Sequence, residues 1–183
     1  MENKPWTNNK LKGKIASDSL AFTKNRSSDY ARRVFTHAED LEFHIWFDKH
    51  YYFREEHGDE NGKREGIGIE AIQELIVKST KHLIYYPLKI KSFVFINFSS
   101  DLMRRSERIV LQNNFHNAPK LNVIAEYHYL DANRFEVTVK TAIRKDDFYF
   151  SDGQYLVEIY DNDKSALHKK ELNKIKIISN YLR

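Results

Sequence analysis

Residues 121–144 read LNVIAEYHYLDANRFEVTVKTAIR, and this stretch decides the expected fold. The segments Asn122–Leu130 and Phe135–Ile143 are rich in β-branched and aromatic residues, and apolar and polar side chains alternate from Phe135 to Lys140, which favours β-strands. The short polar stretch 131–133 between them suits a tight turn. The sequence therefore predicts an antiparallel hairpin here.

Further strands are expected on both sides of this hairpin. The segments Ser92–Phe98 and Arg108–Asn113 precede it, and Gln154–Tyr160 follows the turn Ser151–Gly153. Each is short and rich in β-branched or aromatic residues and ends at turn-forming residues. Together they predict an antiparallel meander.

One helix is predicted with particular clarity. From Gly66 to near Tyr86, before Pro87, apolar residues recur at helical spacing, while Glu70 and Glu74 fall on another face. The apolar positions are Ile69, Ile72, Leu75, Ile76 and Leu83.

Two segments before this helix are read differently. Residues 41–48 alternate as a half-buried strand does, but they also fit a helix begun at His37, and the pattern does not separate the two. Asp48 suits the N-cap of a short helix in KHYYFREEHG, which ends in a glycine.

The last segment, residues 161–183, has a cap-like start followed by spaced apolar residues. Leu167, Leu172, Ile175 and Ile178 fit one face of an amphipathic helix. The chain thus divides into a polar extension (1–30), a single α+β domain (31–160) and a C-terminal helix (161–183).

Composition narrows the function classes. The net charge is +4, from 30 Lys and Arg against 26 Asp and Glu, which permits nucleic-acid binding without requiring it. The absence of cysteine excludes disulfides, thiol catalysis and cysteine-ligated zinc. With neither a signal-like start nor a membrane-length apolar run, we expect a cytoplasmic protein that does not enter membranes.

The segment Lys49–Arg64 carries the candidate chemistry. His50 and Arg54 are one helical turn apart, His57 is a further turn along, and Arg64 returns across the loop. A histidine can move a proton, and guanidinium groups can hold a phosphate. The alternative is a solvated helix surface, which is the usual setting of such residues.

We expect neither a metal nor a cofactor. The spacings of His37, His44, His50 and His57 do not place them on one face, and no HExxH, Walker or GxGxxG motif occurs. In the strand that ends at Arg144, alternation puts Lys140 and Ala142 on one face and Thr141 on the other, where its hydroxyl could bond a phosphate oxygen. The alternative is that Thr141 is there because β-branched residues suit strands.

The stretch 47–83, FDKHYYFREEHGDENGKREGIGIEAIQELIVKSTKHL, together with the hairpin, resembles a family of small toxins in its HxxxR…RxGI…IxxLI pattern. These are the RelE/BrnT-like toxins of the barnase–EndoU–colicin–RelE ribonuclease fold group. The resemblance covers about Phe47 to Arg144. It implies N-terminal helices packed on a curved antiparallel sheet of four to five strands, here followed by the C-terminal amphipathic helix.

The resemblance also implies roles for individual residues. His50 would be the general acid or base, Arg54 and Arg64 would bind phosphate, and Thr141 would support the site. The RNA-binding set would be Lys49, His57, Lys140 and Arg144.

The resulting hypothesis is a metal-independent endoribonuclease that cleaves RNA through attack of the 2′-hydroxyl. It would be the toxin of a toxin–antitoxin or phage-defence pair, with an antitoxin or immunity protein as partner. The alternatives are a non-catalytic domain that binds nucleic acid or a partner, and an interaction domain that docks through the C-terminal helix.

Overall fold

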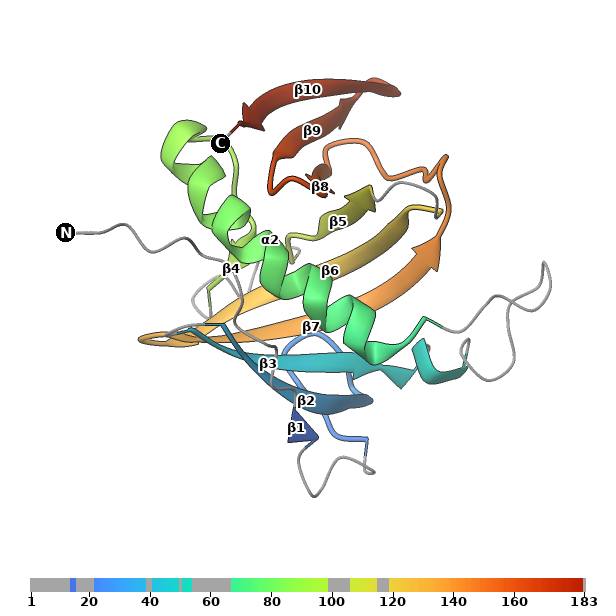
Figure 1. The fold of residues 1–183 in the computed structure, drawn as a ribbon. Coiled ribbons are helices and arrows are strands. Elements are labelled where there is room, and N and C mark those ends of the chain that lie inside the picture. Colours follow the sequence, from blue (N-terminus) through green and yellow to red (C-terminus); the bar gives the residue numbers. More distant parts are fainter. Residues whose placement is uncertain are drawn as a thin grey trace.

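The computed structural model describes residues 14–15, 22–38, 41–49, 51–53, 67–98, 106–114 and 119–182. They form a large mixed β-sheet with the helix α2 (Ile69–Lys89) lying across one face (Figure 1). The strands are β1 (Lys14–Ile15), β2 (Ala31–Ala38), β3 (Leu41–Asp48), β4 (Ile96–Asn97), β5 (Ile109–Asn114), β6 (Leu121–Asp131), β7 (Arg134–Arg144), β8 (Tyr155–Tyr160), β9 (Ser165–Glu171) and β10 (Lys174–Tyr181).

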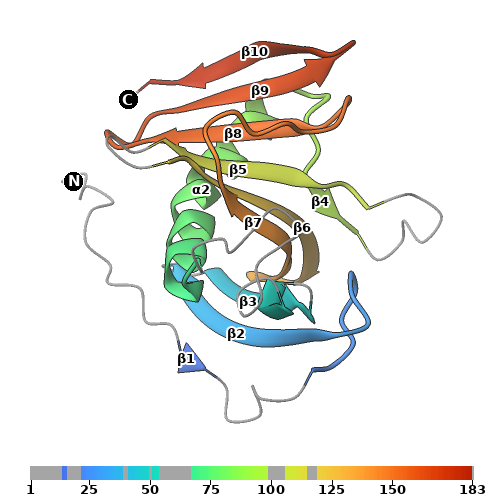
Figure 2. The same cartoon turned by 90° about the vertical axis from the view of Figure 1, so that its right-hand side faces the viewer.

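The strand order is β1-β2-β3-β7-β6-β5-β8-β9-β10, and β4 pairs separately with β6. The β3–β7 and β5–β8 contacts are parallel, and the other pairs along this order are antiparallel. In this register, the carboxyl ends of β3, β5, β7, β8 and β10 lie at the same end of the sheet. The sheet is strongly twisted. Because β2 and β3 are near one end of the strand order and β8 to β10 are at the other, these two groups lie on opposite sides of the molecule (Figure 2).

The expected fold class is wrong. Instead of N-terminal helices on a curved antiparallel sheet of four to five strands, the described N-terminal part supplies strands β2 and β3 to a larger, mixed sheet. Because β3 joins the sheet through a parallel pairing with the distant β7, no local pattern predicts the contact.

The prediction of a C-terminal amphipathic helix is also wrong, since residues 165–181 form the antiparallel hairpin β9–β10. The apolar residues that suggested a helix have different environments: Leu167 is fully buried, while Ile175 is half exposed. Leu172 and Asn173 are the turn residues, with φ of 51° and 61°. Positive φ at both positions defines a type I′ turn, whose twist matches that of the paired strands.

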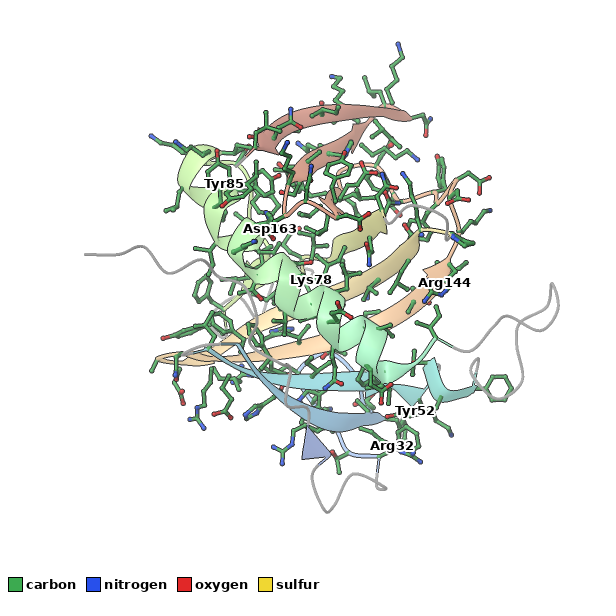
Figure 3. The ribbon with its side chains drawn as sticks, viewed as in Figure 1. Arg32, Tyr52, Lys78, Tyr85, Arg144 and Asp163 are labelled. Atoms are coloured by element: carbon green, nitrogen blue, oxygen red, sulfur yellow. The ribbon has the colours of Figure 1, made fainter. Side chains whose placement is uncertain are left out.

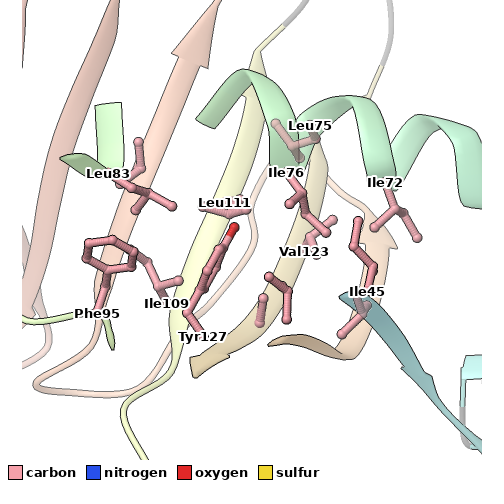
Figure 4. Packing of buried hydrophobic residues seen from close by; sticks show 14 of the residues in the cluster. Ile45, Ile72, Leu75, Ile76, Leu83, Phe95, Ile109, Leu111, Val123 and Tyr127 are labelled. Atoms are coloured by element: carbon pink, nitrogen blue, oxygen red, sulfur yellow. The ribbon is translucent and has the colours of Figure 1, made fainter. Parts of the chain in front are cut away.

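The helix predicted from Gly66 is confirmed as α2, although it runs to Lys89, through Pro87. Its buried side chains include Ile72, Ile76 and Leu83. These pack on apolar residues of the sheet, which form the main core (Figure 4). No helix in the described part of the chain is long and apolar enough to cross a membrane.

The predicted strands are largely confirmed, but their arrangement as an antiparallel meander is wrong, because β8 pairs with β5 and β4 pairs with β6, both in parallel. The hairpin β6–β7 turns at 132–133 as expected, and β5 and β8 match the segments assigned to them. The 92–98 segment contributes only the two-residue strand β4. Residues 41–48 form the strand β3, and the described residues that follow, Lys49 and 51–53, have helical backbone.

The face of the sheet opposite α2, here called the helix-free face, carries many polar side chains. Residues 22–30, the described end of the predicted polar extension, lie over part of it: Asn25 donates to Thr138 Oγ1 and the backbone N–H of Arg26 donates to Glu136. Near its middle, Phe150 packs on Val110 in a small second core. The candidate site lies on the part of the helix-free face that residues 22–30 do not cover.

Candidate functional site

Most of the sequence-predicted catalytic set cannot be placed. His50, Arg54 and Arg64 lie outside the described residues, as does His57 of the RNA-binding set. Thr141, the remaining catalytic candidate, is half-buried on β7. The shared site proposed from the sequence therefore stays a prediction.

The predicted alternation around Thr141 is wrong, because β7 contains a β-bulge. The register shifts between Ile124 and Ala125 on β6, which makes Lys140 the extra residue. Ala142 packs against the main core, whereas Lys140 points to the helix-free face. Lys140 and Ala142 therefore lie on opposite faces.

The predicted RNA-binding lysine on β7 is held by neighbours. The Lys140 ammonium donates to the backbone oxygen of Ser27 at 2.9 Å and lies 3.5 Å from the carboxylate of Asp48. Lys49, another member of the predicted RNA-binding set, directly follows Asp48 in the chain and is exposed. The structure thus places Asp48, the last residue of β3, next to Lys140 of β7.

Arg144 is exposed at the carboxyl end of β7, opposite Leu121 (Figure 3). The next residue, Lys145, donates its backbone N–H to the carbonyl of Lys120 at 2.8 Å. Leu121 belongs to the main core, so its cross-strand partner Arg144 lies on the face of the sheet that α2 covers. The backbone contact places only Lys145 next to Lys120, which belongs to a cluster that the sequence did not predict.

This cluster, here called the Glu158 cluster, consists of Asn114, Lys120, Glu158, Tyr160 and His168. The Lys120 ammonium lies 2.9 Å from Glu158 Oε1, and the Asn114 amide donates to the same oxygen at 2.9 Å. Tyr160 and His168 each approach Oε2 to 3.0 Å. One carboxylate thus holds a cation, an imidazole, a phenol and an amide.

Register explains how these residues meet. Glu158 and Tyr160 alternate with core residues on β8, so both face the helix-free side. Asn114 on β5 pairs directly with Tyr160, and His168 on β9 pairs with Leu156, two residues before Glu158. Neighbouring strands therefore bring these groups onto one face.

The carboxylate and the phenol of the cluster have shifted pKa values. The hydrogen bond from His168, opposed by burial and reinforced by Lys120 and Tyr160, lowers the pKa of Glu158 to about 2. Burial and the adjacent carboxylate raise the pKa of Tyr160 to about 12. Glu158 is therefore ionised and Tyr160 protonated.

The cluster is partly accessible to solvent, chiefly at Lys120, and borders a pocket. The side chains of His168 and Lys120 are 14% and 27% exposed. A pocket of about 310 Å³, here called the end pocket, adjoins the cluster because Asn114 and Tyr160 belong to both. Its other lining residues are Asp161, Asn162, Lys164, Ser165, Asn180 and Leu182.

A second polar cluster lies at the other part of the helix-free face. Ser27 Oγ is 2.8 Å from His128 Nε2, and Arg108 donates to Glu126 at 2.7 Å. The side chains of Glu126 and His128 are only 3% and 9% exposed, beneath residues 22–30. The cluster ties that segment to the sheet and leaves a substrate no access to its carboxylate.

The sequence carried a partial signal for the Glu158 cluster. Glu158 stands between Val157 and Ile159 in a predicted strand, and such a polar residue on an otherwise apolar strand points to the second face. The sequence predicts a helix around His168, and a helix there would not place His168 beside Glu158. In the described residues no group of three or more His, Asp or Glu side chains could hold a metal ion.

Comparison of the chain with protein-family models, with characterised proteins and with solved structures finds no match.

Proposed function

We propose that the chain is a metal-independent endoribonuclease and that His168 of the Glu158 cluster transfers the proton. The observation that carries this proposal is that His168 and Lys120 share one buried carboxylate beside a pocket. A positioned acid or base next to a cation is the combination that phosphodiester cleavage requires.

His168 is oriented for this role by Glu158. With Nε2 protonated, the imidazole donates to the carboxylate, and Nδ1 is left as the acceptor. The proton of the ribose 2′-hydroxyl passes to Nδ1 while the 2′-oxygen attacks the phosphorus. The bond to the 5′-oxygen breaks, solvent protonates that oxygen, and the product is a 2′,3′-cyclic phosphate.

Lys120 supplies the positive charge. An ammonium has three donors, and Lys120 directs two of them toward Glu158 at 2.9 Å and Gln112 at 3.5 Å. The third donor is available to a phosphate oxygen at the exposed side.

The cellular role that we propose rests on the sequence resemblance of residues 47–144. It is that of the toxin of a toxin–antitoxin or phage-defence pair, acting in the cytoplasm, with an antitoxin or immunity protein as its partner.

The proposal is tested by incubating the purified chain with mixed-sequence RNA in EDTA. We expect His168→Ala to slow cleavage by roughly 100-fold or more, since general acid–base catalysis contributes about 10²–10⁴-fold. His44→Ala is the matched control, because His44 also pairs with a carboxylate, that of Glu42, and is similarly buried at 12% exposure. Its rate should remain close to that of the wild type.

A His50→Ala variant separates the two candidate sites. If it abolishes cleavage while His168→Ala does not, the chemistry belongs to the segment predicted from the sequence, and the assignment to His168 is wrong. If the wild type does not cleave RNA at all, the enzymatic proposal fails. Salt-sensitive RNA binding that survives both substitutions would then identify a non-catalytic binding domain.

A further inference from the structure

We infer that the end pocket binds a nucleobase of the RNA next to the scissile phosphate. This inference rests on the proposed function and adds a base-recognition subsite to it. Asn114 and Tyr160 donate to Glu158 and also line the pocket. A nucleotide whose phosphate lies at Lys120 therefore has a cavity for its base directly beside it.

Strand pairing places a residue of the pocket in line with the Glu158 carboxylate. Asn180 on β10 pairs with Ala166 on β9, which pairs in turn with Glu158 on β8. Cross-strand partners lie on the same face of a sheet, so Asn180 and Glu158 belong to one row. The side chain between them is only a methyl group.

The lining suits a neutral, planar and polar group. The carboxamides of Asn114, Asn162 and Asn180 combine donors with acceptors, as the edges of nucleobases do. Leu182, which is 74% exposed, offers an apolar contact. Because Asp161 offsets the charge of Lys164, the pocket is a poor site for a phosphate.

Ser165 forms part of the pocket wall, but its hydroxyl is already hydrogen-bonded within the protein. Its hydroxyl lies 2.9 Å from His82 Nδ1 and 2.7 Å from the Tyr86 hydroxyl. Burial and the nearby Lys81 lower the pKa of His82 to about 4, so the ring is neutral and its Nδ1 shares a hydrogen bond with the Ser165 hydroxyl. The recognition of a base is therefore left to the exposed carboxamides of Asn162 and Asn180.

The volume is consistent with this ligand class. At about 310 Å³ the pocket lies at the small end of the range of roughly 300–1,000 Å³ in which proteins bind small organic molecules. A single base fits this scale.

The test measures binding of the four nucleoside 3′-monophosphates by calorimetry, with ribose 5-phosphate as the probe that lacks a base. At least one nucleotide should bind about tenfold or more tightly than ribose 5-phosphate, and Asn180→Ala should remove most of this difference. Ser179→Ala is the control, because Ser179 neighbours Asn180 but pairs with Leu167 of the main core.

The outcomes separate this inference from the proposed function. Equal affinity for nucleotides and ribose 5-phosphate, or an Asn180→Ala variant as tight as the wild type, overturns the base subsite even if RNA is cleaved. Base-dependent binding by a chain that does not cleave RNA supports the subsite and overturns the proposed activity.

Discussion

Glu126 is almost fully buried on β6, and its carboxylate is nevertheless ionised. Burial alone would raise its pKa, but the neighbouring His128 and Ser27 and the Arg108 guanidinium lower it to about 2 from an ordinary 4.5. A group whose pKa is depressed by folding stabilises the fold above its unfolded pKa, and this stabilisation is lost as the pH falls through the folded pKa. The expected window of loss is therefore between about pH 4.5 and 2.

We therefore predict that Glu126→Gln lowers the free energy of unfolding at pH 7 by about 2 kcal/mol, because Arg108 loses a charged partner. The difference from the wild type should narrow markedly at pH 2.5. Urea titrations at both pH values measure it, and Glu107→Gln, at an exposed position, is the control. A difference that is the same at both pH values would show that the carboxylate charge is not what stabilises this site.

The β9–β10 hairpin contains a residue that does not suit its conformation. Leu172 has a φ of 51° and is 88% exposed, so it has the left-handed backbone that favours glycine or asparagine without a compensating core contact. We predict that Leu172→Gly raises the free energy of unfolding by roughly 0.5–1 kcal/mol. Leu172→Val should lower it, since β-branching opposes this conformation. Chemical denaturation of both variants decides, and a stabilising valine would contradict the turn assignment.

The helix α2 offers a matched pair of isoleucines on its two faces. Ile76 is fully buried against the sheet, whereas Ile84 is 50% exposed. Ile76→Ala should cost about 2–5 kcal/mol through lost burial and the cavity left behind. Ile84→Ala should change stability by no more than about 0.5 kcal/mol. Equal losses in urea denaturation would mean that α2 does not pack on the sheet through the Ile76 face.

At the scale of the whole molecule, the sequence predicted elements better than their assembly. The alternation of residues 135–140 in β7 and the helical period of α2 are local, so each can be recognised from the sequence of its own segment. The C-terminal segment was predicted wrongly because Leu172, which is a turn residue, lies three residues before Ile175 and six before Ile178, a spacing that also fits a helix. The parallel pairing of β3 with β7 depends on packing between distant segments, which no local pattern records.

The candidate site follows the same logic. Alternation could place Glu158 on the second face of a strand, but not beside His168, because that contact depends on β9 being a strand. Lys120 joins them from just before β6. The cluster therefore exists only in the assembled sheet, whereas the His50 and Arg54 pattern can be read from adjacent turns of one segment.

The most direct measurement of the central claim is the rate at which 2′,3′-cyclic phosphate ends form on RNA in EDTA, in the wild type and in His168→Ala. The account predicts that the wild type forms these ends and that the variant forms them at least roughly 100-fold more slowly, while its cooperative thermal unfolding shows that it is still folded. Equal rates in the two proteins, or no cyclic phosphate from the wild type, would contradict it.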